Sequence, residues 1–293
     1  MSTRYEANAY GKINLHLDVL DKMENGYHNV ESVMQSVSLC DKITLDIDSI
    51  GGEENIIEIS VADGKLPNDK TNLVYKCAKK FFDVTKITGK KCFFHIEKHI
   101  PIAAGMAGGS ADGAVAMRLL NEACGQALSY DELCKIGAQV GADIPFCIKG
   151  GTCLCKGMGD SLTPINSLKN AYLVSAIDSS SVSTPVAFSL LDEKYGTECK
   201  CSKDISPMVV AIENNDLSSV CALLYNKFES VIIPINQNVQ KIKDIMVENG
   251  AMGTLMSGSG PSVFGIFMDE SSQKKALIAL QNCSINAFLC KTI

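Results

Sequence analysis

Apolar and polar residues alternate in the first patterned part of the chain, residues 12–19. Such alternation predicts a β-strand, because successive side chains of a strand point to opposite faces. One face is apolar and is expected to join the core; its residues are Ile13, Leu15, Leu17 and Val19. The other face is polar and begins with a cation; its residues are Lys12, Asn14, His16 and Asp18. We expect His16 and Asp18 to lie at the surface or behind the residues that contact a ligand.

Similar patterns divide the rest of the chain into strands and helices. Segments with a strand pattern are 42–48, 55–61, 92–100, 171–177 and 287–289, with a strand–loop–strand unit at 254–268 and two strand-like runs separated by Gly150-Gly151. Segments with a helical pattern are 71–82, 114–124, 129–140, 208–226 and 237–249, with further helices starting near 183 and at 272. Ser129 and Glu132 have the spacing of a capping box. The mixture of strands and helices predicts an α/β protein.

A run of small residues, IPIAAGMAGGSADG at 100–113, joins the strand at 92–100 to the helix at 114–124. Backbone N–H groups of such a loop, at a helix start, can surround an anion. Three common phosphate-binding templates do not fit: the P-loop lysine is absent, the Rossmann glycine spacing differs, and the protein-kinase triplets do not occur. Taken alone, the run also fits an ordinary tight connection from strand to helix.

Composition and charge narrow the class of protein. The 293 residues suit two domains of ordinary size, and 46% hydrophobic against 20% charged residues is typical of a globular chain. The net charge of −6 argues against a nucleic-acid partner, because binding the phosphate backbone needs a surplus of cations. Neither a signal peptide nor an apolar run of membrane-spanning length occurs, so we expect a cytoplasmic protein with no membrane partner.

Thirteen cysteines are scattered through the chain. Their odd number, their spread and the size of the core favour free, reduced thiols over a disulfide framework. The two C-x-C pairs are Cys153/Cys155 and Cys199/Cys201. His95 and His99 lie four residues apart but follow the rhythm of a strand, so a metal site there has little support.

Three glycine-containing segments resemble, in the right order, the motifs of the GHMP kinases, the superfamily of galactokinase, homoserine kinase, mevalonate kinase and phosphomevalonate kinase. They are AYGKINLHLDVL at 9–20, PIAAGMAGGS at 101–110 and MSGSGPSVFGIF at 256–267. The resemblance implies the two-domain α/β (α+β) GHMP kinase fold, with an N-terminal domain like ribosomal protein S5 domain 2 and a C-terminal ferredoxin-like sandwich. We expect the N-terminal domain at residues 1–163 and the C-terminal domain at residues 164–293.

Within the superfamily, three segments resemble the 4-diphosphocytidyl-2-C-methyl-D-erythritol kinases. They are NGYHNVESVMQ at 25–35, IPIAAGMAGGSADGA at 100–114 and GADIPFCIKGG at 141–151. The resemblance implies an ATP- and Mg²⁺-dependent phosphotransferase, which phosphorylates the 2-hydroxyl of a cytidyl-diphosphate sugar alcohol in the methylerythritol phosphate route to isoprenoid precursors. It also implies a small-molecule partner and a monomer or weak homodimer.

The resemblance assigns roles to individual residues. The family's catalytic aspartate falls on Asp143, which would accept the proton of the attacking hydroxyl, and its lysine falls on Lys12, which would hold that hydroxyl or the γ-phosphate. Read without the resemblance, Asp143 also suits a helix N-cap before Pro145, and Lys12 a solvated lysine at a strand edge. Asn14 matches an asparagine that holds the substrate. The residues that match the cytosine site are Tyr27, His28 and Phe188. Without the resemblance, Tyr27 and His28 would be read as the flank of a hairpin, and Phe188 as a core residue of a helix.

The glycine-rich run is assigned to the triphosphate of ATP, with a bare backbone that leaves room for the phosphates. The assigned residues are Pro101, Ile102, Ala103, Ala104, Gly105, Met106, Ala107, Gly108, Gly109, Ser110 and Ala111. Ala111 stands where relatives often have a second hydroxyl, and Gly108 and Gly109 stand where the wider superfamily has serines. The protein ligands of Mg²⁺ are therefore left unassigned.

Two other functions remain open at this point. One is another kinase of the superfamily, acting on homoserine or mevalonate, and the second is a nucleotide-binding module without catalysis. The presence of both Lys12 and Asp143 argues against the second. A structural protein with a decorative loop would leave the ordered set of motifs unexplained.

Overall fold

The computed structural model describes the chain except residues 1, 63, 65 and 103 and the segments 179–181 and 198–202. Ala103 and the pair Cys199/Cys201 therefore lie outside the described residues. The chain forms two compact units that are interleaved along the sequence. Unit 1 contains Met1–Gly11, Cys40–Ile102 and Ala107–Gly150, and unit 2 contains Lys12–Leu39, Ala103–Met106 and Gly151–Ile293.

Two long strands, β1 (Thr3–Lys22) and β2 (His28–Ser49), contribute residues to both units. The remaining strands are β3 (Ile56–Val61), β4 (Lys90–Glu97), β5 (Thr152–Lys156), β6 (Ser161–Ile165), β7 (Tyr172–Ile177), β8 (Tyr225–Asn226), β9 (Gly253–Met256), β10 (Ser262–Phe267) and β11 (Asn286–Lys291). The helices are α1 (Leu73–Thr85), α2 (Gly108–Ala123), α3 (Tyr130–Ala138), α4 (Ile144–Lys149), α5 (Thr184–Tyr195), α6 (Ser206–Glu213), α7 (Leu217–Leu223), α8 (Glu229–Ile232), α9 (Gln237–Glu248) and α10 (Glu270–Asn282).

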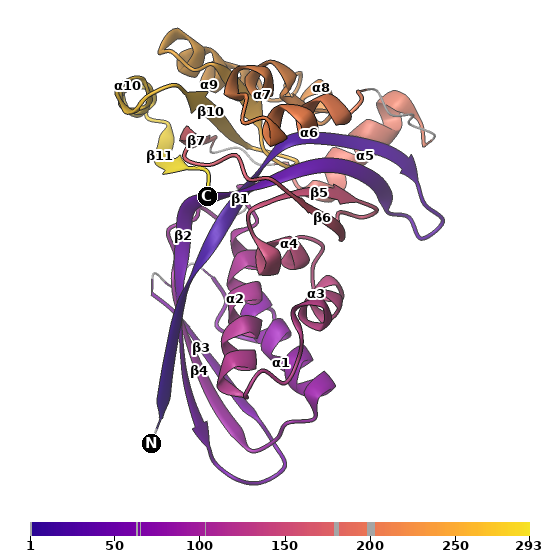
Figure 1. Cartoon of the computed structure of the whole chain (residues 1–293), viewed down its shortest axis with the longest axis vertical. Coiled ribbons are helices and arrows are strands. Elements are labelled where there is room, and N and C mark those ends of the chain that lie inside the picture. The colour runs from indigo at the N-terminus through magenta and orange to yellow at the C-terminus, as the bar shows by residue number, and fades with distance from the viewer. Residues whose placement is uncertain (1, 63, 65, 103, 179–181, 198–202) are drawn as a thin grey trace. The chain divides into compact units, whose positions relative to one another are not determined.

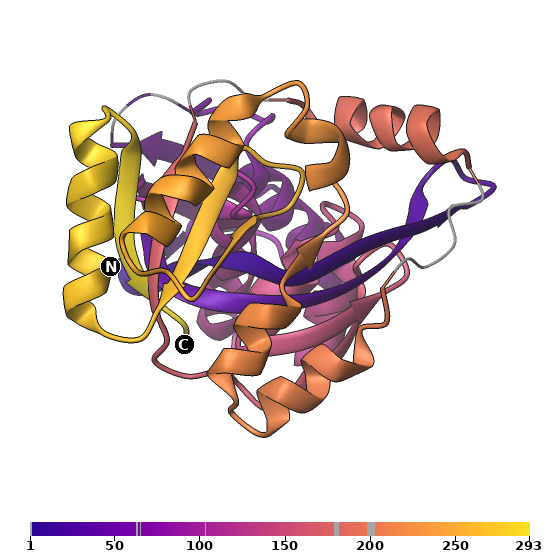
Figure 2. The ribbon, with the colours of Figure 1, turned by 90° about the horizontal axis from the view of Figure 1, so that it is seen from above.

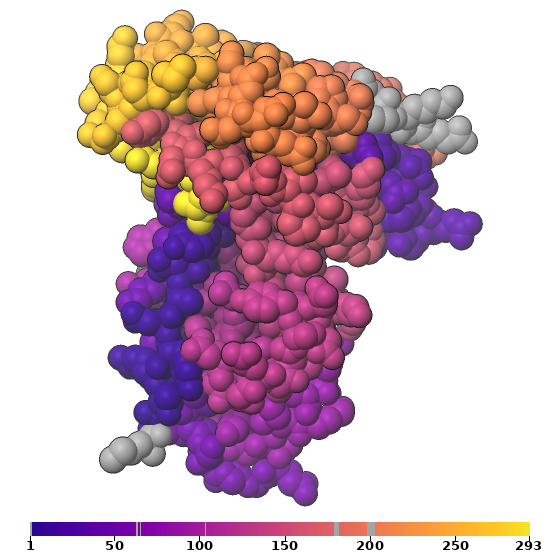
Figure 3. Space-filling model, in the orientation of Figure 1, coloured from indigo at the N-terminus to yellow at the C-terminus, as the bar shows by residue number. Residues whose placement is uncertain are grey.

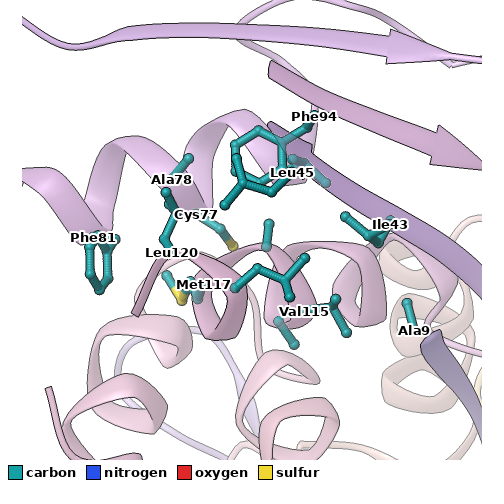
Figure 4. Packing of buried hydrophobic residues seen from close by; sticks show 14 of the residues in the cluster. Ala9, Ile43, Leu45, Cys77, Ala78, Phe81, Phe94, Val115, Met117 and Leu120 are labelled. Atoms are coloured by element: carbon teal, nitrogen blue, oxygen red, sulfur yellow. The ribbon is translucent and has the colours of Figure 1, made fainter. Parts of the chain in front are cut away.

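Unit 1 is a layer of helices on one face of a sheet. β4 pairs with β2 in antiparallel and with β3 in parallel orientation, and α1 and α2 cover these strands (Figure 1). In Figure 3, side chains of the α2 and α3 region, in magenta, form much of the visible face of unit 1, beside the indigo residues at the start of β1. Between helices and strands lies an apolar core that includes Leu45, Phe94, Met117 and Leu120, all fully buried (Figure 4). Burial of this apolar surface holds α2, and with it the glycine-rich helix start, against the sheet.

Unit 2 contains a ferredoxin-like sandwich. Its four-stranded sheet has the order β11-β7-β10-β9, and every neighbouring pair is antiparallel. α9 and α10 pack against these strands (Figure 2), through buried residues such as Met246 and Leu280. The chain order β7, α9, β9, β10, α10, β11 is the β-α-β-β-α-β arrangement of the ferredoxin-like fold, as the resemblance implied.

A second group of strands in unit 2 extends the sheet formed by β1 and β2. β8 pairs in parallel with β1 at His16 and Leu17, and β5 pairs with β2 and with β6. His16 is 1% exposed and Asp18 is completely buried, so the prediction that they could lie at the surface was wrong. Asp18 is held by the Lys227 ammonium at 2.9 Å. An alternating pattern identifies the two faces of a strand, but here both faces are covered.

Several local predictions are confirmed by the structure. Ser129 and Glu132 form the capping box of α3, and Pro185 lies in the first turn of α5 after Ser183. Another prediction was also wrong: the run before Gly150 is the helix α4, not a strand. Short apolar runs do not distinguish a buried strand from a buried helix turn, and proline fits the first turn of a helix.

The predicted helix at 208–226 is interrupted. α6 ends at Glu213, Asn215 has a left-handed backbone (φ +53°), and Asp216 caps α7. The last two residues of the predicted helix form β8 instead. The cysteines that the structure describes are all free. No described helix combines the length and the apolar character that a membrane span requires.

Candidate functional site

α2 begins at Gly108 in unit 1, earlier than predicted, and no side chain caps its first turn. The N-cap residue, Ala107, has a left-handed backbone (φ +57°), and its methyl group cannot accept a hydrogen bond. The uncapped N–H groups and the helix dipole make this end favourable for a phosphate. Ser110 adds a hydroxyl in the same turn.

Glycine allows close packing at the start of α2 inside unit 1. A Cβ on Gly108 would lie 2.9 Å from Ile100 Cγ2 and 3.3 Å from Lys98 Nζ. A Cβ on Gly109 would lie 3.3 Å from Leu73 Cδ1. At these two residues the small side chain lets the helix approach its neighbours in unit 1, which is a different reason from the room for phosphates that we inferred from the sequence.

The chain around Gly105 packs against the glycine motif at 256–260 within unit 2. Gly105 has a φ of +71°, and a Cβ there would lie 2.5 Å from the carbonyl oxygen of Ser257. Ser257 Oγ donates to the Gly105 carbonyl at 3.1 Å, and Lys12 N donates to the Met106 carbonyl at 3.0 Å. Parts of all three predicted motifs therefore meet in unit 2.

Lys12 and Asn14 form a buried polar pair on β1 of unit 2. Lys12 is 4% exposed, which contradicts the alternative of a solvated edge lysine. Lys12 Nζ donates to Asn14 Oδ1 at 2.7 Å, and the same oxygen accepts the Gly258 N–H at 3.1 Å. In unit 2, the partner of this ammonium among the described residues is thus a carboxamide oxygen. A buried cation without a counter-ion is costly, so a bound phosphate would recover electrostatic energy here.

Asp143 lies in unit 1, immediately before α4, and its side chain is half-buried. It occupies the N-cap position, but its side chain makes no capping hydrogen bond. The carboxylate therefore does not serve the structural role that the sequence left open. Gly141 lies close to the start of α2, since a Cβ there would lie 3.9 Å from Ser110 Oγ. Unit 1 thus brings the turn that precedes α4 close to the first turn of α2.

His28 and Phe188 form a stacked aromatic pair in unit 2, with ring centroids 4.9 Å apart and planes inclined by 20°. His28 Nε2 lies 2.6 Å from Asp192 Oδ1, and the other oxygen of Asp192 accepts from Lys22 Nζ at 2.6 Å. Tyr27, the preceding residue, is 65% exposed, which leaves a ring face accessible for stacking. The three residues predicted for a base site are therefore found in one unit, with His28 and Phe188 in contact.

Sequence reasoning missed two groups of residues beside these side chains. Asp192 follows Phe188 by four residues on α5, and this spacing places both on one face of a helix, which was a usable signal. Asn226 and Glu229 hold the glycine motif at 256–260, but they fall around a two-residue strand that helical periodicity concealed.

A buried ionic cluster supports the start of α2 in unit 1. Lys98 contacts the carboxylates of Asp41 and Asp112, the second at 2.8 Å, and all three side chains are at most 5% exposed. Asp41 also accepts the backbone N–H groups of His99 and Ile100. The cluster therefore ties the chain that enters the glycine-rich run to the helix that leaves it. Asp112 Oδ1 has no hydrogen-bond partner, and burial raises the pKa of this carboxyl to about 7.

We expect Asp112→Asn to make the stability of the protein less dependent on pH. An unfolded aspartate titrates near pH ~4, so between that pH and the raised pKa the folded protein binds the extra proton. The free energy of unfolding of the wild type therefore falls as the pH rises through this window. The neutral amide keeps an oxygen for Lys98 and avoids this loss, so the variant should gain a few kcal/mol relative to wild type between pH ~5 and ~8.

Urea denaturation at several pH values measures this difference. Asp83→Asn, on the exposed face of α1, removes the same charge outside the core and should shift stability by about the same small amount at every pH. Parallel curves for wild type and Asp112→Asn would show that Asp112 does not carry the extra proton.

The described part of the chain contains no candidate for a metal site built by protein side chains alone. No group of three or more His, Cys, Asp and Glu side chains occurs there in a suitable arrangement. His95 and His99 accordingly belong to no such group.

Comparison with known proteins identifies the family. Residues 72–151 match the model described as "GHMP kinases N terminal domain", and residues 208–285 match "GHMP kinases C terminal". A protein of Clostridium novyi (strain NT), named 4-diphosphocytidyl-2-C-methyl-D-erythritol kinase, is 37% identical over 285 residues, which are 97% of this chain and 99% of that protein. The chain belongs to the GHMP kinases. It is accordingly an ATP-dependent phosphotransferase with an alcohol as acceptor.

Further relatives and solved structures support the same family for this chain. A Shouchella clausii (strain KSM-K16) protein of the same name is 40% identical over 271 residues, 92% of this chain and 87% of that protein. A crystal structure of 4-(cytidine 5'-diphospho)-2C-methyl-D-erythritol kinase has a TM-score of 0.82 at 24% identity, covering 98% of this chain and 99% of that one. Homoserine kinase from Cytophaga hutchinsonii has a TM-score of 0.76 at 16% identity, over 99% and 94% of the two chains. These structural likenesses confirm the predicted fold.

Proposed function

We propose that this GHMP kinase transfers the γ-phosphoryl group of ATP to the 2-hydroxyl of 4-diphosphocytidyl-2-C-methyl-D-erythritol. The observation that carries the proposal is the likeness of nearly the whole chain to proteins with that kinase name, at 37% and 40% identity. The same substrate explains why aromatic side chains gather near the end of β1 in unit 2. The rival acceptors homoserine and mevalonate have no aromatic ring to stack.

The triphosphate of ATP would contact the glycine-rich run at 101–111. Its support is the uncapped first turn of α2, whose N–H groups attract anions, and the hydroxyl of Ser110. Mg²⁺ would be held by phosphate oxygens and water, with Ser110 as a suitable additional oxygen donor, and would neutralise charge on the phosphates.

Lys12 and Asp143 would perform the chemistry on the acceptor hydroxyl. The hydroxyl oxygen forms a bond to the γ-phosphorus, the bond from that phosphorus to the β–γ bridging oxygen breaks, and ADP leaves. Asp143 would take the hydroxyl proton. Its carboxylate suits that task because it is half-buried and makes no capping hydrogen bond to α4. Lys12 would stabilise the charge of the transferring group, with Asn14 fixing the ammonium through the 2.7 Å hydrogen bond.

The cytosine ring would bind beside Tyr27, His28 and Phe188. Stacking on aromatic rings suits a neutral flat base, and hydrogen bonds to the base edge would distinguish cytosine from other bases. His28 is held in position by Asp192, which is hydrogen-bonded to Nε2 at 2.6 Å and pairs with Lys22. A fixed imidazole costs less entropy to order when the base binds.

A coupled assay of ADP release tests the proposal. Release should be fast with the cytidyl substrate and near background with homoserine or mevalonate, and CDP should inhibit by competing for the base site. Faster turnover with either rival acceptor, or indifference to CDP, would assign a different substrate. Binding of ATP with no ADP release for any of the three acceptors would instead favour a nucleotide-binding module.

Three further expectations belong to this proposal. We propose a domain boundary at residues 163/164, a monomer or weak homodimer, and a cytoplasmic location. The free thiols of the described cysteines suit a reducing compartment, and burial raises the pKa of several of them, including Cys77 to about 12. Sedimentation of the purified chain measures its oligomeric state.

A further inference from the structure

Asn226 holds the glycine motif at 256–260 by two hydrogen bonds from one amide group. Its Nδ2 donates to the carbonyl oxygen of Met256 at 2.7 Å and to that of Gly258 at 2.8 Å. Its Oδ1 accepts the backbone N–H of Phe228 at 3.0 Å. The side chain is 4% exposed, and both of its N–H donors are used. One carboxamide thus fixes the curvature of the turn between two carbonyl groups.

The turn that Asn226 holds is connected to Lys12. The Gly258 N–H donates to Asn14 Oδ1 at 3.1 Å, and this oxygen is also the acceptor for Lys12 Nζ at 2.7 Å. A Cβ on Gly258 would lie 3.7 Å from Lys12 Nζ, which shows how closely the turn approaches the ammonium. If the turn moved, Asn14 would lose one of the two groups that fix its oxygen, and Lys12 would lose a fixed partner.

Asn226 is itself anchored to the strand that carries Lys12. It is the partner of Leu17 in the pairing of β8 with β1, and the next residue, Lys227, donates its backbone N–H to the Leu17 carbonyl at 2.9 Å. The Asn226 amide and the Lys12 ammonium are therefore both carried by backbone that is fixed by the pairing of β8 with β1 in unit 2. A side chain on a paired strand positions a neighbouring turn more accurately than one on a loop.

Glu229 adds a second attachment to the same turn. Its Oε1 accepts the Met256 N–H at 2.8 Å, and Lys243 Nζ contacts both carboxylate oxygens at 2.7 Å. The N–H of Met256 is therefore held from one side and its carbonyl oxygen from the other.

We infer that Asn226 is a positioning residue for phosphoryl transfer, acting through the 256–258 turn and Asn14 on the ammonium of Lys12. This inference rests on the proposed function of Lys12 and deepens it. Asn226 touches neither substrate; it sets where the cation stands relative to the transferring group, and displacements of about 1 Å at such groups cost ~10²-fold in rate.

The variant Asn226→Asp tests this inference in the full chain. It keeps the shape and the acceptor for Phe228 but replaces two donors with a carboxyl group facing two carbonyl oxygens. We expect kcat to fall roughly 10- to 100-fold, with KM for the acceptor within about threefold of wild type. The defect should be smaller at pH ~6 than at pH ~8.5, because a protonated carboxyl donates one hydrogen bond again.

Asn236→Asp is a matched control. Asn236 is also buried in unit 2, and it likewise donates from Nδ2, to Asp178 at 2.8 Å, and accepts a backbone N–H, from Asn238. Its substitution should lower the melting temperature comparably but leave kcat within twofold of wild type. Equal losses of kcat in the two variants, or a kcat within twofold of wild type for Asn226→Asp at every pH, would overturn the inference.

Glu229→Ala decides the matter if Asn226→Asp does not fold. It removes the acceptor of the Met256 N–H from the same turn, and Glu229→Gln keeps that acceptor. The inference expects a loss of kcat for the alanine variant and its recovery in the glutamine variant; no loss in either overturns it. The wild-type enzyme separates this inference from the proposed function. If wild type phosphorylates a different alcohol, the proposed substrate is wrong. The kcat values of the variants are then compared with that of wild type on that alcohol.

Discussion

Asp143→Asn is expected to lower kcat by about 10²- to 10⁴-fold while leaving ATP binding nearly unchanged. The amide has almost the same shape as the carboxylate, but it cannot accept the proton of the attacking hydroxyl. Because the Asp143 side chain makes no capping hydrogen bond to α4, its replacement should cost little stability. Single-turnover measurements of ADP formation, together with equilibrium titration of a nucleotide analogue, separate the chemical step from binding.

Asp131→Asn provides the control for that experiment. Asp131 lies in the first turn of α3 in the same unit, its side chain is 79% exposed, and its contact with Lys149 is long at 3.7 Å. The control removes the same charge and should keep kcat within twofold of wild type. If Asp143→Asn also kept its turnover, Asp143 would lose its role as the proton acceptor, and another group would have to take the proton.

Local sequence patterns predicted much of this fold because they report local physics. The alternation in β1 follows from the period of a strand, and the capping box at Ser129 follows from the unsatisfied N–H groups of a helix start. Helix and strand were confused where the pattern was short. The six residues of α4 are mostly apolar, and six residues are too few to show a period.

Only those residues of the candidate site that lie within a sequence motif could be predicted from the sequence. Motif resemblance assigned Lys12 and Asp143 to the candidate site, but neither the burial of Lys12 nor the missing cap at Asp143 could be read from their neighbours in sequence. Asn226 was missed because its partners, Met256 and Gly258, are about 30 residues away. A side chain whose role depends on distant backbone carbonyls leaves no periodic signal.

Gly105→Ala is expected to damage both stability and catalysis. The φ of +71° disfavours alanine by about 1 kcal/mol, and the new Cβ would lie 2.5 Å from the carbonyl oxygen of Ser257, which must then move. Ser257 precedes the Gly258 N–H that binds Asn14, so displacement of this turn reaches the group that holds Lys12. We expect the free energy of unfolding to fall by about 2–4 kcal/mol and kcat/KM to fall about 10²-fold.

The contribution of the collision can be separated from that of backbone strain by Gly125→Ala. Gly125 follows α2 with nearly the same φ, +74°, but a Cβ there would have no heavy atom within 4 Å. This variant should therefore lose about 1 kcal/mol through strain alone, with kcat/KM within twofold of wild type. Urea denaturation and steady-state kinetics on both variants measure the difference. Equal stability losses with intact activity in both would mean that the contact between Gly105 and Ser257 does not position Lys12.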